Sequence, residues 1–370
     1  EADAEGNLTT KRYKINLKPD NFSASKSITW MEVSKDKKSE AGVIVAELPR
    51  KQSKYFQYTY TKPADYTESN TRINDTLSAD SVNKVVFKTS DGSAIYNTKD
   101  NSSVNITADF IGNSASLSSM ISNRGFIGNI SGNFMGNFGQ AIYNSSNGTA
   151  IIGDITGNFL SNYVQYLSKY SKLTLGGAVY SNANLSFTAK GKQRFFSGNY
   201  TNDQTRGKNY NALFVQSVTD LASAPVIAFD TTGGGAWVVN DSIEGGYASS
   251  TDVTYAGRYY NLSFTGDGVL NEDGLTDQYI SINNDIINAG EVTVEGTTLR
   301  FGAYQHEDKT AHNWDGHGRF LAALKADGTA DLDAEAVTSL SLNNAAFDLY
   351  NEYQDTVNLK GWKASGDSFL

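Results

Sequence analysis

Short runs of alternating apolar and polar residues, bounded by glycine and asparagine, recur along residues 86–200. The stretch from Gly125 to Asn162 contains nearly the same run twice, as "IGNISGNFMGN" and "IGDITGNFLSN". Ile127, Ile130 and Phe134 are the apolar positions of the first copy. Alternation with a period of two predicts β-strands, and the flanking glycines and asparagines predict tight turns between them.

Two motifs alternate along this region. The first, seen as "FIGN", "FMGN", "FLSN" and "FSGN", places its phenylalanine in one register, with spacings of 24, 25 and 37 residues: Phe110, Phe134, Phe159 and Phe196. The second occurs four times: "GSAIYN" at Gly92–Asn97, "SSMISN" at Ser118–Asn123, "GQAIYN" at Gly139–Asn144 and "GGAVYSN" at Gly176–Asn182. In this second motif we expect Ala141 and Tyr143 to share one strand face.

The repeat unit is too small to fold alone. About 24 residues with two or three short strands cannot bury their own apolar face, whereas stacked copies bury one continuous column. The sequence therefore predicts an all-β fold, a parallel β-helix, in which each coil adds about 4.8 Å and equivalent side chains lie above one another. We expect the phenylalanines to fill the interior.

The asparagine that ends the first motif is expected at a turn. There its amide can bond to the adjacent coils, so that substitution costs about 1 to 3 kcal/mol if its partners are left unsatisfied. The positions concerned are Asn113, Asn137, Asn162 and Asn199.

The motifs divide the chain into three parts. Residues 86–200 carry the clear β-helix repeats, and residues 1–85 are predicted to form a β-rich N-terminal cap or irregular first coils, because a bare terminal coil exposes a sheet edge. Residues 201–370 are predicted to continue the same solenoid as degenerate coils. In that part the alternation puts five residues on one strand face: Leu332, Ala334, Ala336, Leu340 and Leu342.

Tyr163 to Leu175 lengthen one coil by about 13 residues. We interpret this insertion as a surface loop, with a binding surface as the alternative.

Composition narrows the picture further. The chain of 370 residues exceeds the size at which one compact core stops growing, which suits an elongated domain. Its net charge of −9 opposes nucleic acid or an anionic membrane as the main partner. The absence of cysteine excludes disulfides, thiolate metal sites and a cysteine nucleophile. No stretch approaches 18 consecutive apolar residues and the first residues do not read as a signal peptide, so neither a spanning helix nor an export signal is expected.

With its ordered tetrapeptides, the chain resembles passenger domains of bacterial autotransporters, especially the group that includes chlamydial polymorphic outer-membrane proteins. That group is known by repeated Gly-Gly-Ala-Ile and Phe-x-x-Asn, which appear here as "GSAI", "GQAI" and "GGAV" and as the four "FxxN" copies. The resemblance covers residues 86–200 best. It implies a right-handed β-helix, located on the bacterial cell surface (outer membrane) or secreted, that commonly acts as an adhesin. Any membrane link is expected to run through a C-terminal β-barrel, which the printed chain does not include.

Three polar stretches were weighed as sites. The first holds His306, His312 and His317, whose spacing matches no tetrahedral zinc signature, so a solvated loop is preferred over a metal site. The second is an acidic turn rather than a calcium loop, since its spacing is not that of an EF-hand. Its acidic residues are Asp267, Glu272, Asp273 and Asp277. The third, Thr231 to Trp237, is glycine-rich but lacks the lysine of a phosphate loop, so it is predicted to be a turn.

Two further stretches raised other functions. Asp367 and Ser368 lie in "ASGDSFL", but a serine protease needs a base held against the serine, and protease activity is not favoured. The stretch from residue 48 to residue 62, "LPRKQSKYFQYTYTK", mixes basic and aromatic residues as a glycan or single-strand binder does, and a β-strand with one aromatic face is the preferred interpretation. Its residues of interest are Arg50, Lys51, Lys54, Tyr55, Phe56, Tyr58 and Tyr60.

The sequence thus predicts a surface-exposed or secreted adhesin that binds a host cell-surface or matrix protein or glycan, or copies of itself. No catalytic residue, cofactor or metal is predicted. The alternative is a carbohydrate-active enzyme, a polysaccharide lyase or hydrolase, because β-helices also host such enzymes.

Overall fold

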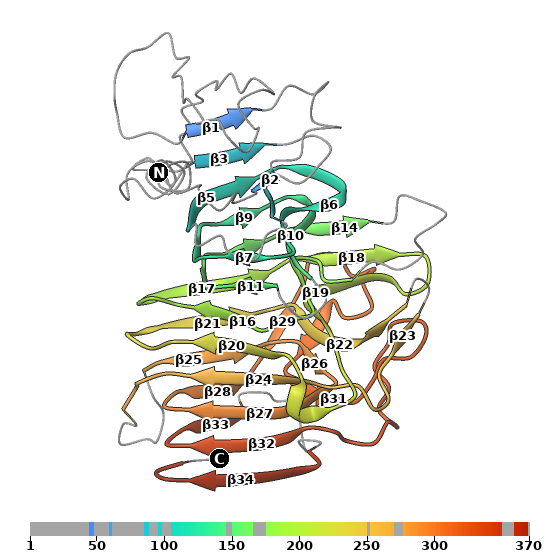
Figure 1. Cartoon of the computed structure of the whole chain (residues 1–370). Coiled ribbons are helices and arrows are strands. Elements are labelled where there is room, and N and C mark those ends of the chain that lie inside the picture. Colours follow the sequence, from blue (N-terminus) through green and yellow to red (C-terminus); the bar gives the residue numbers. More distant parts are fainter. Residues whose placement is uncertain are drawn as a thin grey trace.

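Successive coils of the chain contribute strands to three faces, and equivalent strands of these coils pair in parallel (Figure 1). This computed structural model describes strands β1 to β4 and residues 105–145, 150–165, 175–249, 252–269, 277–349 and 359–368. The described chain is all-β, and its stacked parallel ladders form a parallel β-helix, which confirms the predicted fold class.

The three faces follow one another along the chain, and β5 joins the first two faces into one sheet. The first face contains β5 (Ile106–Ile111), β8 (Ile130–Ser131), β12 (Asp154–Thr156), β16 (Leu185–Thr188), β20 (Val226–Asp230), β24 (Tyr260–Thr265), β27 (Ala289–Glu295), β32 (Ser339–Asn343) and β34 (Gly361–Ser365). The second contains β1 (Ile44–Glu47), β3 (Val85–Lys88), β9 (Phe134–Met135), β13 (Phe159–Leu160), β17 (Lys192–Ser197), β21 (Gly235–Val239), β25 (Tyr279–Ile282), β28 (Thr298–Phe301) and β33 (Ala346–Leu349).

The third face is less regular, because hairpins leave it and return to it. Its strands are β2 (Thr59–Tyr60), β4 (Ile95–Asn97), β6 (Ser114–Asn123), β10 (Phe138–Asn144), β14 (Tyr163–Gln165), β15 (Val179–Ser181), β18 (Tyr200–Asp203), β19 (Gly207–Gln216), β22 (Ser242–Ala248), β23 (Val253–Thr254), β26 (Asp285–Ile287) and β31 (Arg319–Leu321). Two small pairs complete the described strands: β7 (Phe126–Ile127) with β11 (Ile151–Ile152), and β29 (Ala303–Gln305) with β30 (Asp315–His317).

The motif phenylalanines form the predicted interior column. Phe110, Phe134, Phe159 and Phe196 are paired in register on the second face. Their rings stack nearly parallel with centroids 4.7, 5.0 and 4.4 Å apart, and all four are buried. The pairing of Phe159 with Phe196 confirms the register across the long spacing, so the extra residues leave the coil after Phe159 and return before Phe196.

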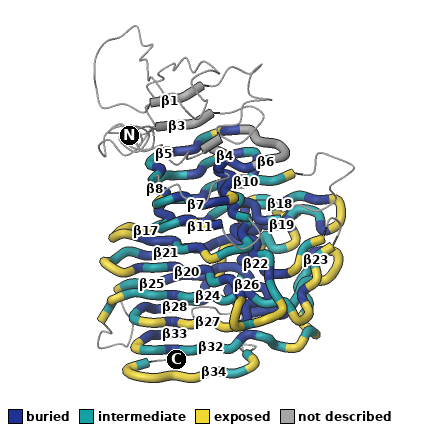
Figure 2. Tube along the Cα trace, in the orientation of Figure 1, coloured by how far each residue is buried: buried dark blue, intermediate teal, exposed yellow. Residues whose placement is uncertain are grey.

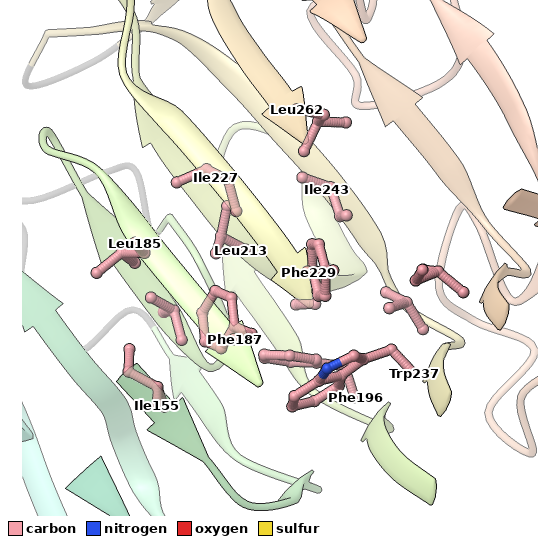
Figure 3. Packing of buried hydrophobic residues seen from close by; sticks show 14 of the residues in the cluster. Ile155, Leu185, Phe187, Phe196, Leu213, Ile227, Phe229, Trp237, Ile243 and Leu262 are labelled. Atoms are coloured by element: carbon pink, nitrogen blue, oxygen red, sulfur yellow. The ribbon is translucent and has the colours of Figure 1, made fainter. Parts of the chain in front are cut away.

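Side chains from all three faces meet in one core (Figure 3). Leu185, Phe196 and Leu213 come from the first, second and third face of one coil, and all three are buried in the same apolar cluster. Phe187 and Trp237 pack edge to face with centroids 5.9 Å apart. The core runs continuously along the solenoid because strands such as β24 and β27 turn alternate residues inward, and Figure 2 shows the buried positions repeating from coil to coil.

Two predicted strand faces differ from the structure in burial. In the second motif, Ala141 is fully buried, whereas Tyr143 keeps an intermediate exposure. In the last part of the chain, Leu340 and Leu342 are buried in β32, but Leu332 is 66% exposed.

The exposure of Leu332 has a local cause. The backbone N–H of Asp333 donates to the Asp331 carboxylate, which makes a turn where the alternation had indicated a strand. Ala334 and Ala336 therefore lie outside any strand, and β32 begins at Ser339.

The N-terminal prediction stays a prediction. Apart from β1 and β2, residues 1–84 lie outside the described residues, and so do the basic and aromatic residues from Arg50 to Tyr58. Among the described residues, no helix has the length and apolar character needed to cross a membrane.

Candidate functional site

Two rows of aromatic rings lie on the outer side of the third face. Each ring is stacked on its neighbour in the next coil, with centroids 4.9 and 5.2 Å apart in one row and 4.9 and 5.8 Å apart in the other. The rows are Phe138, Tyr163 and Tyr200, and Tyr143, Tyr180 and Phe214. We call the half-exposed residues of the first coils the aromatic face: Phe138, Tyr143, Tyr163 and Tyr180.

The direction of these rings follows from their neighbours. Ile142 and Val179 are buried in the core, and consecutive strand residues point to opposite sides of a sheet. Tyr143 and Tyr180, which follow them directly, therefore point outward and keep an intermediate exposure.

In later coils the chain covers the same outer column itself. The register continues from Tyr180 to Phe214, Glu244, Ile287 and Leu321, and the last four are buried. The residues that pack over this part come from the β22–β23 hairpin and from the segment after β31: Val253, Tyr255, Ala323, Leu324 and Ala330. The aromatic face is thus the part of the column where the rings keep solvent-exposed surface.

The aromatic face is electrically neutral. Strands β10, β14 and β15 contain no charged residue, and their polar side chains include Gln140 and Gln165. Burial, together with the neighbouring Tyr143, raises the pKa of Tyr180, so its phenol stays protonated at neutral pH. That hydroxyl donates to Gln216 Oε1 at 3.3 Å. A charge appears at the end of the first row, where Lys208 Nζ lies 4.1 Å from the Tyr200 ring centroid.

An asparagine ladder runs along the turn between the second and third faces. The side-chain amide of each asparagine donates to the side-chain oxygen of the residue in the next coil, at 2.8, 2.7, 2.9 and 2.7 Å. The ladder is formed by Asn113, Asn137, Asn162 and Asn199, and it ends at Asp241. All five are buried, which confirms the predicted turn position and cross-coil bonding of the asparagines.

Asp241 is a buried carboxylate at the end of this ladder. It accepts bonds from the backbone N–H groups of Gly198 and Asn199 and from the Asn199 amide. Burial nevertheless raises its pKa to about 7. His306 Nε2 lies 3.4 Å from Asp241 Oδ1 and 3.0 Å from Asn240 O.

His306 comes from the β29–β30 hairpin and is 5% exposed. Its ring stacks on Tyr210 with centroids 3.5 Å apart, and burial lowers its pKa to about 4. The expectation of a solvated histidine loop was therefore wrong for His306, since the hairpin packs back onto the third face. His312 is exposed and His317 is half-buried, 3.9 Å from Asp315.

A second buried polar cluster lies beneath the hairpins of the third face. Arg206 Nη1 bonds to Glu244 Oε1 at 2.6 Å, and Tyr255 donates to the same oxygen at 2.6 Å. Asn211 donates to Glu244 Oε2 at 2.9 Å. Burial alone would lower the pKa of Arg206, but Glu244, Tyr255 and Asp203 outweigh it and raise the pKa, so the guanidinium stays charged. These bonds hold the hairpins against the solenoid.

Other candidate residues have structural surroundings. Within the described residues, no group of three or more His, Asp or Glu side chains is placed to hold a metal ion. Asp267 accepts from Gly233 N and Gln278 Nε2, while Glu272 and Asp273 lie outside the described residues. The predicted turn is confirmed at residues 232–234, whereas Gly235 to Trp237 already belong to β21; Gly233, Gly234 and Gly235 have φ values of 78°, 97° and 98°.

The remaining two stretches add little. Ser368 Oγ donates to Ser365 O at 2.6 Å and accepts from Ala345 N, which places it in a turn. Residues 166–174 of the insertion lie outside the described residues, and Tyr163–Gln165 at its start form β14.

The sequence analysis did not predict the outer aromatic rows, although Tyr143 and Tyr180 are part of its second motif. The signal was the isoleucine or valine before each tyrosine, which repeats in register and takes the inward position. It also missed Asp241, which accepts from the last ladder asparagine although it follows Val239 by two residues, whereas Asn199 follows Phe196 by three.

Comparison of the chain with family models, with curated proteins and with solved structures finds no match. The family resemblance and the function that it implies therefore rest on the motifs alone.

Proposed function

We propose that this chain is a surface-exposed or secreted binding protein, an adhesin of the autotransporter-passenger type, that contacts its partner through the aromatic face. One observation carries the proposal: Tyr143 and Tyr180 keep exposed surface, whereas the same column is buried from Phe214 onward and the chain's own segments pack over Ile287 and Leu321. Tyrosine is enriched in binding surfaces because it offers apolar area and a hydroxyl.

The stacking of the rings supports a binding role. Each tyrosine is held by a ring in the neighbouring coil, at 4.9 Å between Tyr143 and Tyr180, so little rotamer freedom remains to be lost on binding. A contact surface that is ordered in advance binds more tightly than one that must be ordered by its ligand. A chain displayed in many copies on a cell would add multivalency to each weak contact.

Binding of the purified chain to host cells and to extracellular-matrix proteins tests this proposal. We expect the wild-type chain to bind, and a Tyr143→Ala, Tyr180→Ala double variant to lose most of that binding. The matched control is Tyr247→Ala, which removes a tyrosine that is 44% exposed and lies outside the aromatic face. Circular dichroism of each variant checks that the β-helix is folded.

Two outcomes would contradict different parts of this proposal. If wild-type protein binds neither cells nor matrix and does not make displaying cells aggregate, the adhesin proposal is wrong. If the double variant binds as well as wild type, the contact surface is elsewhere. The enzyme hypothesis stays a prediction, and release of reducing ends or unsaturated products from a glycan panel tests it in parallel.

A further inference from the structure

The size of the aromatic face limits what it can bind. Its width is the length of β10, seven residues at about 3.3 Å each, or roughly 20 Å. Its length is two or three coil spacings, given by ring separations near 5 Å, so its area is roughly 300 Å². A stable protein interface buries about 800 Å² on each partner. The face is therefore small for a second copy of this chain or another folded protein and suits a narrow ligand.

Its charge limits the ligand further. Nucleic acids and sulfated or carboxylated polysaccharides are held largely by lysine and arginine. Because the described strands β10, β14 and β15 carry no charged residue, these strands offer such ligands no ion pair. A neutral ligand loses no charge solvation when it lies there.

The backbone of the face argues against an extended peptide. Peptides that join a sheet bind at its edge through free backbone groups. Here β10 is paired on both sides, with β6 and with β14 and β15, so the aromatic face is the flat side of a sheet and its backbone is already bonded. Side chains alone are available for recognition.

The exposed groups match sugars. Because the rings stack face to face, they present their edges outward, and the phenols of Tyr143 and Tyr163 and the amide of Gln165 lie in the same strands. The Tyr180 hydroxyl donates to Gln216 Oε1 and can still accept a bond, whereas the Gln140 amide already donates to Leu175 O. Hydroxyls and amides both donate and accept hydrogen bonds, as sugar hydroxyls require, and ring edges give apolar contact to sugar C–H groups. The contacts recur once in each coil. The distance between neighbouring coils is close to the length that one sugar adds to an extended chain, so successive sugars can make the same contacts.

We infer that the ligand of the aromatic face is a neutral glycan chain, lying along the solenoid axis across β10, β14 and β15. This inference rests on the proposed function, because it names the ligand class of the same surface.

The test compares binding of the whole chain to cells whose surface sugars or surface proteins have been altered. Periodate opens the rings of sugars that carry neighbouring hydroxyls, and we expect it to reduce binding at least fivefold, while mild protease treatment of the cells leaves substantial binding. The same preparations are tested with Tyr143→Phe, Tyr180→Phe protein, which keeps both stacked rings and loses two hydroxyls. We expect this variant to bind untreated cells at least fivefold more weakly, with Tyr247→Phe as the matched control.

The outcomes separate the two proposals. No cell binding by the wild-type chain contradicts the proposed function itself. Binding that survives periodate and is lost after protease treatment leaves an adhesin whose ligand is a protein, and overturns the glycan inference. Equal binding by the double Phe variant overturns the assignment to the tyrosine hydroxyls. A concentration-dependent dimer in sedimentation that both Tyr→Ala changes abolish would assign the face to a second copy of the chain instead.

Discussion

The coils from Ile106 to Tyr200 and the coils from Tyr200 to Leu349 share the same parallel ladders but differ on the third face. The earlier coils stack identical uncharged residues, such as the phenylalanine and asparagine columns, and their outer tyrosines keep exposed surface. The later coils place Val239 and Ile282 in the phenylalanine column, and hairpins cover their outer side.

The difference lies in where buried charge is placed. In the earlier coils, ladders of one residue type satisfy their own hydrogen bonds, since each asparagine both donates and accepts. In the later coils, the hairpins that cover the sheet carry Arg206, and the covered sheet carries Glu244, so the two must be paired to be buried. The regularly stacked earlier coils thus leave their outer face uncovered. In the later coils, irregular hairpins cover this face and are held by a specific ion pair.

The largest effect is expected from breaking that ion pair. Arg206→Met leaves Glu244 buried at 2% exposure with no cation, and should lower the free energy of unfolding by about 3 to 5 kcal/mol. Urea unfolding followed by circular dichroism measures the change. The matched control is Arg300→Met, whose pair with Asp348 is partly exposed, so a loss of about 0 to 1 kcal/mol is expected.

A double change sharpens this test. Adding Glu244→Leu to Arg206→Met removes the unpaired charge, and stability should recover in part because apolar replacements of buried ion pairs are often neutral. If Arg206→Met costs no more than Arg300→Met, the hairpins are not held by the buried pair, and the contrast between the two regions loses its physical basis.

A smaller loss is expected in the earlier coils. Asn137→Ala removes a side chain that accepts from Asn113 and donates to Asn162 and to Phe110 O. Leaving these buried groups unsatisfied should cost about 1 to 3 kcal/mol, again measured by urea unfolding. Asn133→Ala, in a parallel but half-buried asparagine row, is the control and should cost less because water can replace its bonds. Equal losses for the two variants would mean that burial of the ladder is not what makes it stabilising.

Much of the fold could be predicted from the sequence because stacking makes position periodic. The motif spacing predicts one register for Phe110 and Phe196, since an inward site that repeats every coil selects the same residue type each time. The later coils could not be predicted from the motif in this way. There Val239 and Ile282 fill the same column without the motif, and at Asp331 to Asp333 a side-chain turn interrupts an apparent strand.

The candidate site was harder to predict than the fold. The repeat alone does not show that Tyr143 lies on the outer side, and the inward position belongs to Ile142. The burial of His306 could not be read from its own stretch, because it depends on Tyr210 and Asp241, which are distant in sequence and meet it only through the fold. Spacing along the chain reports local periodicity, whereas these contacts depend on how a hairpin folds back.

The last prediction concerns Asp241, where the ladder passes from one region to the other. Its pKa of about 7 in the folded chain is above the ordinary value of 3.8, so between these values the folded state binds a proton that the unfolded state lacks. This group therefore favours folding at low pH, and its contribution is lost as the pH rises from about 4 to about 7. In Asp241→Asn the contribution is absent. The stability of wild type relative to the variant should fall across that range and level off above it.

His306 opposes this trend and must be kept constant in the comparison. Its pKa of about 4 lies below the ordinary 6.5, so its contribution is present at neutral pH and is lost as the pH falls from about 6.5 to about 4. Because both proteins retain His306, the difference between their urea-unfolding curves at pH 4.5, 6 and 7.5 reports Asp241 together with its contact to His306. A difference that does not change with pH would show that the carboxylate is ionised throughout.

The control Asn162→Asp should be unstable at pH 7.5, because a carboxylate there cannot donate to Phe134 O or to Asn199 Oδ1. At the end of the ladder, Asp241 only accepts hydrogen bonds from Gly198 and Asn199, so a carboxylate fits there. In the middle of the ladder the side chain must also donate, so a carboxylate does not fit.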